Sequence, residues 1–392
     1  MDKNRKGRWG ILMIFMLAHA ANDGFGWVIP PLLPAIRDHF HVSYTEMGAF
    51  FTLFRFFAGF MQAPVSYLVY FVPAPALLVG GMLWSSVGMI LASLSMSFTL
   101  LVWVAAISGI GRAPYHPLAV SILSRVYGRA LLGRVIGLHL SASSTGQIVA
   151  PFLIVLLLER YGWRVPLLVW SSLGLVAGVS MFFFLRRQKG DIHPKEKTLN
   201  WPYFSRPLGI YILSVTVWGV VQSALMTFIP LFLVDQRGFS AGKAAFVYGM
   251  MALAAALCRP FLGVLMDRMG RRKPVIIGGF IISGLATVSL AFLTTPWILY
   301  VTLILLGIFL SGHSGLADTF MVELIPSQRR EETLGFMYTL RMGVASCSPL
   351  LVGFLSERYG LIETFSIMGL VSLSSAVILA FAEEKPWAET TL

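Results

Sequence analysis

The chain has 392 residues, of which 57% are hydrophobic and only 12% are charged, with a net charge of +12. Soluble domains are about half apolar and about a quarter charged, so this composition excludes an ordinary soluble fold. An aromatic content of 13% excludes disorder, and a chain with only two cysteines is not a disulfide-stabilised secreted scaffold. The sequence therefore predicts an all-α polytopic membrane protein.

Twelve apolar stretches are long enough to cross a bilayer, for which a helix needs about 20 residues. In the first half of the chain we predict spans at residues 9–35, 46–70, 75–95, 98–122, 133–158 and 163–185. In the second half we predict spans at residues 207–234, 243–266, 274–293, 297–322, 333–356 and 361–382. Because the one long polar segment separates these sets, we expect a bundle at residues 1–185, a cytoplasmic linker at 186–206 and a second bundle at 207–392.

Lysine and arginine side chains lie mainly on one side of the predicted bilayer. The twenty on that side are Lys3, Arg5, Lys6, Arg8, Arg125, Arg129, Arg134, Arg186, Arg187, Lys189, Lys195, Lys197, Arg206, Arg268, Arg271, Arg272, Lys273, Arg329, Arg330 and Lys385. The six on the other side are Arg37, Arg160, Arg164, Arg237, Lys243 and Arg358. The positive-inside rule then places both termini in the cytoplasm. Since topology explains most of the charge, we expect no nucleic-acid partner.

The two halves of the chain are related by an internal repeat. Residues 149–162, VAPFLIVLLLERYG, align with residues 347–360, CSPLLVGFLSERYG, at an offset of 198 residues. The same offset pairs Gly109 with Gly307 without a gap. Related halves joined by a basic loop predict two pseudo-symmetric six-helix bundles. Transporters of this type bind substrate near the membrane midplane and expose it alternately to the two sides.

A charged motif lies between the predicted spans 8 and 9. It reads GVLMDRMGRRK and contains Gly263, Asp267, Arg268, Gly270 and Arg271. The motif resembles the G-x-x-x-D-R-x-G-R-R signature of the major facilitator superfamily, and this resemblance extends over nearly the whole chain. It implies a twelve-helix transporter in which these residues form a cytoplasmic gate, with Asp267 pairing with a cation or capping a helix and Gly263 allowing close helix approach. The alternative is a basic loop that only sets topology.

The first half departs from the superfamily pattern and resembles one of its branches. The loop at residues 70–75 has no charge, so a second copy of the gate motif is missing, and a symmetric gate is not expected. Residues 15–155 resemble fosmidomycin-resistance-type efflux proteins through HAAND in span 1, QAPV in span 2, and GIG and HP in span 4. Gly146 and Pro151 in span 5 resemble the motif of proton antiporters. The resemblance implies proton-driven export of a small molecule across a bacterial inner membrane.

Span 1 carries an acid inside the bilayer, where a charge costs at least about 2.5–3.5 kcal/mol and needs a partner, a cavity or a role. We expect this span to end at three prolines, Pro30, Pro31 and Pro34. His19 and Asp23 lie four residues apart and share a helix face. Arg55 of span 2 lies at a similar depth, so we interpret Asp23, His19 and Arg55 as a proton-coupling group. The alternatives are a static ion pair and simple helix packing.

Span 4 has an interrupted polar stretch. Arg112 and His116 lie four residues apart, and Pro114 and Pro117 break the helix around them. A broken helix commonly lines a cavity, so Arg112 and His116 are candidate substrate ligands, together with Asn22 of span 1. The alternative is that the prolines only kink the helix.

The second half carries further buried candidates. Arg259 in span 8 and Arg341 in span 11 suit a carboxylate or phosphate group, because a guanidinium can bind two oxygens. His313 in span 10 is a third candidate substrate ligand. Asp318, near the end of the same span, is a candidate gating residue that could neutralise either arginine. The alternative for Arg259 is support of the neighbouring gate motif.

Other kinds of function lack their motifs. The intramembrane histidines at positions 19, 116, 139 and 313 show no metal-ligand spacing within one segment, so we expect no metal site and no cofactor. Neither a Walker A sequence nor a G-x-S-x-G motif is present, so ATP-driven transport and catalysis are not expected. The sequence predicts a monomeric secondary transporter that exchanges protons for a small organic compound. The alternatives are an uptake symporter for a small organic anion, bound by Arg259 and Arg341, and a non-transporting membrane sensor or enzyme.

Overall fold

The computed structural model describes residues 3–62, 64, 68–69, 71–127, 129–186, 201–293, 295–326 and 329–384. Every regular element in these residues is a helix. Nine of the described helices are long and apolar enough to cross a membrane, and two shorter apolar helices lie at residues 98–112 and 273–289. The predicted all-α polytopic membrane fold is thus confirmed.

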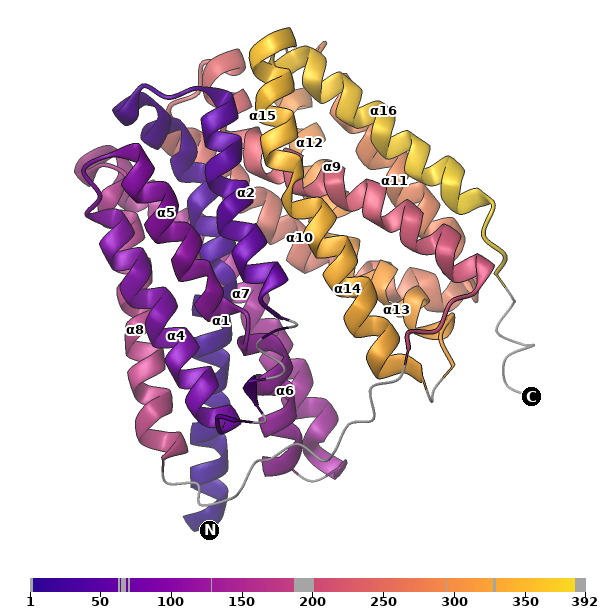
Figure 1. Ribbon diagram of the computed structural model, residues 1–392. Helices are drawn as coiled ribbons and strands as arrows, with labels where there is room; N and C mark the ends of the chain where they lie inside the picture. The colour runs from indigo at the N-terminus through magenta and orange to yellow at the C-terminus, as the bar shows by residue number, and fades with distance from the viewer. Residues whose placement is uncertain are drawn as a thin grey trace. The chain divides into compact units, whose positions relative to one another are not determined.

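The helices follow the predicted spans closely. In the first half they are α1 (Lys3–Phe40), α2 (Tyr44–Phe60), α4 (Ala74–Ser93), α5 (Phe98–Gly109), α6 (Tyr115–Val126), α7 (Arg129–Tyr161) and α8 (Arg164–Leu185), as Figure 1 shows. In the second half they are α9 (Arg206–Arg237), α10 (Ala241–Met269), α11 (Lys273–Ser289), α12 (Pro296–Leu306), α13 (Ser314–Glu323), α14 (Arg330–Ser346), α15 (Ser348–Tyr359) and α16 (Leu361–Ala380).

The chain divides into two compact units. Unit 1 comprises Met1–Val42, Phe50–Lys197 and Ser240–Phe246, and unit 2 comprises Ser43–Ala49, Thr198–Phe239 and Val247–Leu392. The main division falls within the predicted linker at residues 186–206, of which residues 187–200 lie outside the described part of the chain. The limits of the two predicted bundles remain predictions.

The first helix is longer than the sequence predicts. The expectation that span 1 ends at its three prolines is wrong, because α1 continues through them to Phe40. Each proline removes one backbone donor, which membrane helices tolerate when neighbouring groups satisfy the freed carbonyls. Leu32, Leu33 and Ile36 are buried beside the prolines, so apolar packing holds this part of the helix in place.

The predicted break in span 4 is present, and the repeat places a second break in span 10. A 3-10 turn at Ile110–Arg112 separates α5 from α6, and a π-helical turn at Gly307–Gly312 separates α12 from α13. A Cβ on Gly109 would lie 2.7 Å from the carbonyl oxygen of Phe54, and one on Gly307 would lie 2.5 Å from that of Met251. The first break therefore follows, and the second begins at, a glycine against which another helix packs closely.

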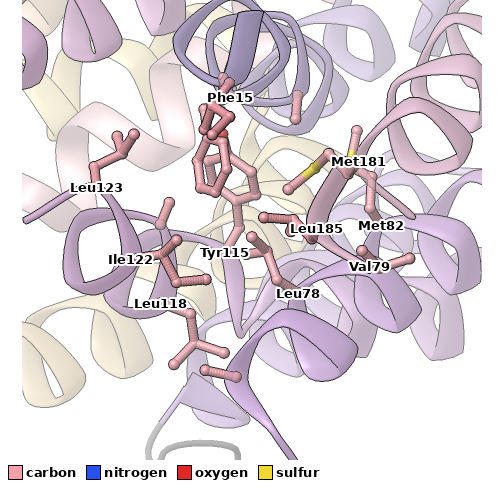
Figure 2. Close-up of a cluster of buried hydrophobic side chains, with 14 of the residues drawn as sticks. Phe15, Leu78, Val79, Met82, Tyr115, Leu118, Ile122, Leu123, Met181 and Leu185 are labelled. Carbon is pink, nitrogen blue, oxygen red and sulfur yellow. The ribbon is translucent and has the colours of Figure 1, made fainter. Parts of the chain in front are cut away.

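An apolar core in unit 1 supports the face of α1 that carries His19. Phe15, Tyr115 and Met181 are among the buried side chains of this core, shown in Figure 2. The hydroxyl of Tyr115 donates a hydrogen bond to the carbonyl oxygen of Phe15 at 2.6 Å. Burial of an aromatic side chain with its polar group satisfied is strongly stabilising, so α6 is fixed against α1 one turn before His19.

Gly146 controls how closely α7 approaches α1. A Cβ at Gly146 would lie 2.1 Å from the carbonyl oxygen of Ala20. We therefore expect Gly146→Ala to force the helices apart and to reduce stability by about 1–3 kcal/mol, the usual cost of overpacking. The matched control is Gly137→Ala in the same helix, where an added Cβ meets nothing within 4 Å. Thermal unfolding in detergent measures both variants, and equal melting temperatures would contradict the close packing.

Candidate functional site

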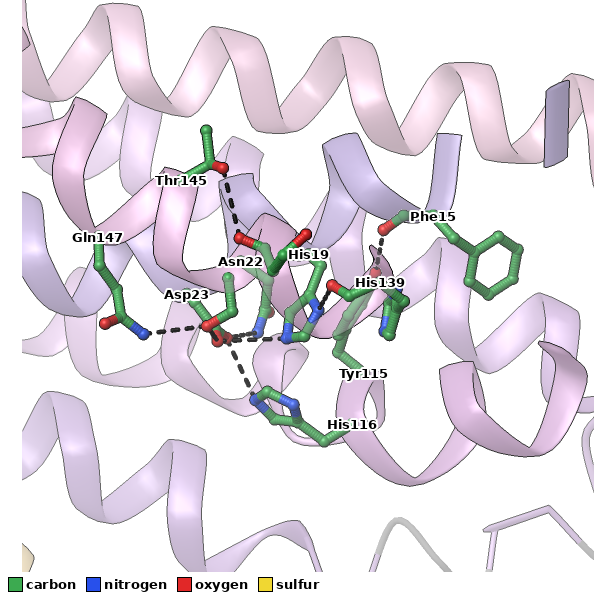
Figure 3. Close-up of polar contacts among 11 residues, drawn as sticks. Phe15, His19, Asn22, Asp23, Tyr115, His116, His139, Thr145 and Gln147 are labelled. Atoms are coloured by element: carbon green, nitrogen blue, oxygen red, sulfur yellow. Dashed lines mark hydrogen bonds and ion pairs between the residues drawn. The ribbon is translucent and has the colours of Figure 1, made fainter. Parts of the chain in front are cut away.

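Asp23 is the centre of a polar cluster in unit 1, shown in Figure 3. Its Oδ2 lies 3.3 Å from Nε2 of His19, and its Oδ1 lies 3.2 Å from Nε2 of His116. The amide of Asn22 donates to Oδ1 at 3.1 Å, and the hydroxyl of Ser143 donates to Oδ2. The structure thus brings together the predicted residues His19, Asn22 and Asp23 with His116 from α6.

The register of α1 against α7 creates this cluster. His19 contacts His139 and Asp23 contacts Ser143, and both pairs are separated by 120 residues. The two helices therefore run parallel, one turn of α1 facing one turn of α7. The close approach at Gly146 brings the α7 backbone near enough for these contacts.

Ser143 is a functional candidate that sequence reasoning missed. It donates to Asp23 and accepts a hydrogen bond from Nε2 of Gln147 at 3.0 Å, so α7 supplies two layers of polar groups. The available signal was the polar run SASSTGQ at residues 141–147, which is unusual within a predicted span. Hydroxyl and amide groups inside a membrane bundle mark a polar helix face.

His19 contacts a carbonyl oxygen with one ring nitrogen and Asp23 with the other. Nδ1 of His19 lies 2.8 Å from the carbonyl oxygen of His139, which only accepts, so Nδ1 carries a hydrogen. Nε2 faces Asp23, and an ionised carboxylate also only accepts. A neutral imidazole beside an ionised carboxylate would place two lone pairs against each other. A proton between Nε2 of His19 and Oδ2 of Asp23 would remove this conflict, so the arrangement is suited to holding one.

The members of the cluster differ in their exposure. The side chains of His19 and Asp23 are 2% and 15% exposed, whereas that of His116 is 47% exposed. His19 also stacks on His139, with the ring centroids 4.2 Å apart. His116 is therefore the most accessible of the three side chains, and His19 is the most buried.

The cluster has the geometry of a cation site, although the sequence predicts no metal. Ligand atoms of His19, Asp23 and His116 all lie within 4.8 Å of one another. The prediction rested on the spacing of ligands within single segments. In the structure, α1 supplies two of the ligand residues and α6 supplies the third.

The two arginines of the first half lie near the cluster. The guanidinium of Arg112 lies over the ring of Phe54 at 5.2 Å and interacts electrostatically with both Asp23 and Arg55. Arg55 lies over the ring of Phe51 at 5.9 Å. The contacts described for Asp23 come from histidines, an amide and a hydroxyl, so the Asp23–Arg55 pair remains a prediction.

The candidates of the second half are separated in unit 2. Nη1 of Arg341 lies 2.7 Å from Oδ1 of Asp318, so Asp318 neutralises this arginine. Arg259 donates to the carbonyl oxygen of Ser311 in the π-helical turn at 3.2 Å. His313 is fully buried between Trp218 and Phe280. The contacts given for the described residues thus assign a different partner to each of the three predicted substrate ligands of this half.

The gate motif spans the end of α10 and the turn before α11. Asp267 and Arg268 are exposed in the last turn of α10, and Gly270 has a positive φ of 61°. Glycine adopts this left-handed conformation without steric cost, which explains its place in the motif. A Cβ on Gly263 would meet nothing within 4 Å, so this glycine permits no close helix contact among the described residues.

Comparisons with known proteins agree on one family. A sequence model of the Major Facilitator Superfamily matches residues 15–259 and 238–392. The fosmidomycin resistance protein of Escherichia coli (strain K12) is 22% identical over 373 residues, which cover 93% of this chain and 91% of that protein. The multidrug resistance protein MdtG of Salmonella arizonae is 24% identical over 310 residues, which cover 76% of each chain.

Solved structures show the same fold. A bacterial homologue of the human lysosomal transporter Spinster, in an inward-facing and occupied conformation, matches with a TM-score of 0.80 at 16% identity, over 97% of this chain and 96% of that one. The nucleoside transporter NupG matches with a TM-score of 0.73 at 13% identity, over 97% of this chain and 100% of that one. At these identities the likeness concerns the fold and not the substrate.

Proposed function

The chain belongs to the major facilitator superfamily and is therefore a multi-pass membrane transporter of small molecules and not an enzyme, and we propose that it exports a small organic compound in exchange for protons. Two relatives with resistance functions, the fosmidomycin resistance protein and MdtG, support the outward direction. The observation that supports proton coupling is the contact of 3.3 Å between Nε2 of His19 and Oδ2 of Asp23 inside a membrane helix.

In the proposed cycle, His19 and Asp23 share one proton, and this proton leaves during transport. When the proton departs, Asp23 remains ionised and His19 becomes neutral, and their facing lone pairs repel each other. His116 and Arg112 then become the groups that stabilise the carboxylate. Loss of the proton therefore changes the contacts between α1 and the broken span 4, which couples protonation to the segment that we propose binds substrate.

The substrate site that we propose in unit 1 comprises Asn22, Arg112 and His116. These side chains are polar and lie around Asp23, and His116 is accessible. Arg259, Arg341 and His313 are the proposed contributions of unit 2. Arg341 is already neutralised by Asp318, so the structure offers no observation that favours the alternative of an organic-anion symporter.

The remaining proposals concern gating and location. We propose that Gly263, Asp267, Arg268, Gly270 and Arg271 form a cytoplasmic gate, and that Asp318 takes part in gating through its arginine partner. The excess of basic residues on one side supports cytoplasmic termini, and the bacterial relatives support the inner membrane. We propose a monomer, since each half of the repeat supplies one bundle of a single transport pathway.

Transport into proteoliposomes under an imposed pH gradient tests this function. An antiporter moves substrate against the direction of proton flow, so we expect one member of a panel of acidic, neutral and cationic solutes to accumulate in the acidic compartment. Accumulation in the alkaline compartment would instead show a symporter and would overturn the proposal. The proposal would also be contradicted if no solute were transported, or if the rate of transport did not depend on the pH gradient.

A further inference from the structure

A groove lies at one end of unit 2, between the start of α11 and the end of α16. The two helices pack antiparallel beside each other in Figure 1, and their backbones meet where a Cβ on Gly284 would lie 2.9 Å from the carbonyl oxygen of Gly369. At the start of α11 the helices are joined differently, because Nζ of Lys273 donates to the carbonyl oxygens of Ala380 and Ala382, each at 2.6 Å. Between these two contacts lies a cavity of about 780 Å³.

The groove is apolar along α11 and charged at the helix ends. Ile277, Gly278 and Ile281 line it on one face of α11, and the ring of Phe381, which is 73% exposed, lines it from α16. A Cβ on Gly278 would meet nothing within 4 Å, so this wall is open. Since α16 is a candidate membrane span that ends at Ala380, the groove lies where hydrocarbon gives way to polar surroundings.

Two charges in the groove are already neutralised by the helices. Lys273 binds the last carbonyls of α16, and Oε1 of Glu384 accepts hydrogen bonds from the main-chain N–H groups of Arg272 and Lys273 at the start of α11. Each charge thus meets the helix end of opposite polarity. Arg271 and Glu383 line the same groove, and within the described residues neither takes part in an ion pair.

We infer that this groove binds one phospholipid with a zwitterionic, ethanolamine-type headgroup. The guanidinium of Arg271 matches the phosphate, and the carboxylate of Glu383 matches a primary ammonium, which has three hydrogens to donate. The acyl chain then lies along Ile277, Gly278 and Ile281 beside Phe381. Choline has no hydrogen to donate, so the groove distinguishes the two common zwitterionic headgroups.

Lipid retention tests the site on the full chain. The protein is reconstituted into nanodiscs with equal amounts of phosphatidylethanolamine and phosphatidylcholine, extracted into detergent, and weighed with its bound lipids by native mass spectrometry. We expect the unmodified protein to retain phosphatidylethanolamine. Gly278→Leu places a side chain where the acyl chain would lie, so we expect it to reduce retention about tenfold, which corresponds to about 1.4 kcal/mol. The matched control is Gly209→Leu on an exposed face of α9, where an added Cβ also meets nothing within 4 Å.

Two charge variants identify the headgroup. We expect Arg271→Gln to weaken retention of both lipids and Glu383→Gln to remove only the preference for phosphatidylethanolamine. Equal retention by Gly278→Leu and Gly209→Leu would overturn the site. So would displacement by water-soluble glycerophosphoethanolamine alone, or retention that appears only after residues 385–392 are removed. None of these results depends on transport, so the proposed function is tested separately.

Discussion

We expect Asp23→Asn to abolish accumulation of substrate driven by a pH gradient while leaving substrate exchange at equal pH intact. Asparagine keeps the size of the side chain, and its single oxygen can accept from either Ser143 or Asn22, but it cannot exchange a proton with His19. Coupling free energies between two sites typically change an affinity by a factor of about 5 to 150. We therefore expect the gradient-driven accumulation ratio to decrease by a factor in that range. Uptake of labelled substrate into proteoliposomes, with and without a gradient, measures both quantities.

The control for this experiment is another aspartate in the same helix. Asp38 lies near the end of α1, its side chain is 67% exposed, and its described ion pair is a long contact of 3.9 Å with Arg37. Asp38→Asn removes the same charge without touching the cluster, and we expect it to transport normally. Full gradient-driven accumulation by Asp23→Asn would eliminate the proton-coupling role, whereas loss of exchange as well as accumulation would assign Asp23 to substrate binding.

The fold was largely predictable because membrane helices are encoded by composition. A span needs a long apolar stretch, and the position of each helix follows from that requirement alone. The exception is the end of α1, where local proline rules predict a stop but the buried side chains around Pro31 keep the helix intact. The break in span 10 was not predicted, although the internal repeat pairs Gly109 with Gly307 and both glycines pack against a neighbouring backbone.

The site was predictable only within single helices. The spacing of His19 and Asp23 gave their contact directly, because residues four apart share a helix face. Contacts between helices depend on helix rotation and register, which hydropathy does not determine. For this reason Ser143 was missed, and Arg55 was chosen by depth alone although α6 and α7 supply the described partners of Asp23. The same limit explains why a cation-binding geometry from two helices was not anticipated.

The ion pair between Asp318 and Arg341 is the second place where one substitution should have a large effect. Nη1 of Arg341 lies 2.7 Å from Oδ1 of Asp318, and the guanidinium also lies over the ring of Tyr338 at 5.1 Å. The side chain of Arg341 is 11% exposed and that of Asp318 is 29% exposed. Removing one partner of a buried pair costs about 3–5 kcal/mol, because the other charge is left without compensation. Because Asp318 is partly exposed, we expect the loss of stability to lie at the lower end of this range.

We therefore expect Asp318→Asn to lower the thermal stability of the protein more than the double variant Asp318→Asn with Arg341→Gln. The double variant removes the orphaned charge as well as the pair, so it recovers part of the loss. Unfolding of the single and double variants in detergent gives the interaction energy of the pair as a double-mutant cycle. Asp38→Asn serves again as the control, because it removes a carboxylate that is exposed and not part of a buried pair. If the stability losses of the two single variants add up to that of the double variant, the interaction energy of the pair is zero and the expectation is wrong. Asp318 would then act, as a gating residue, independently of Arg341.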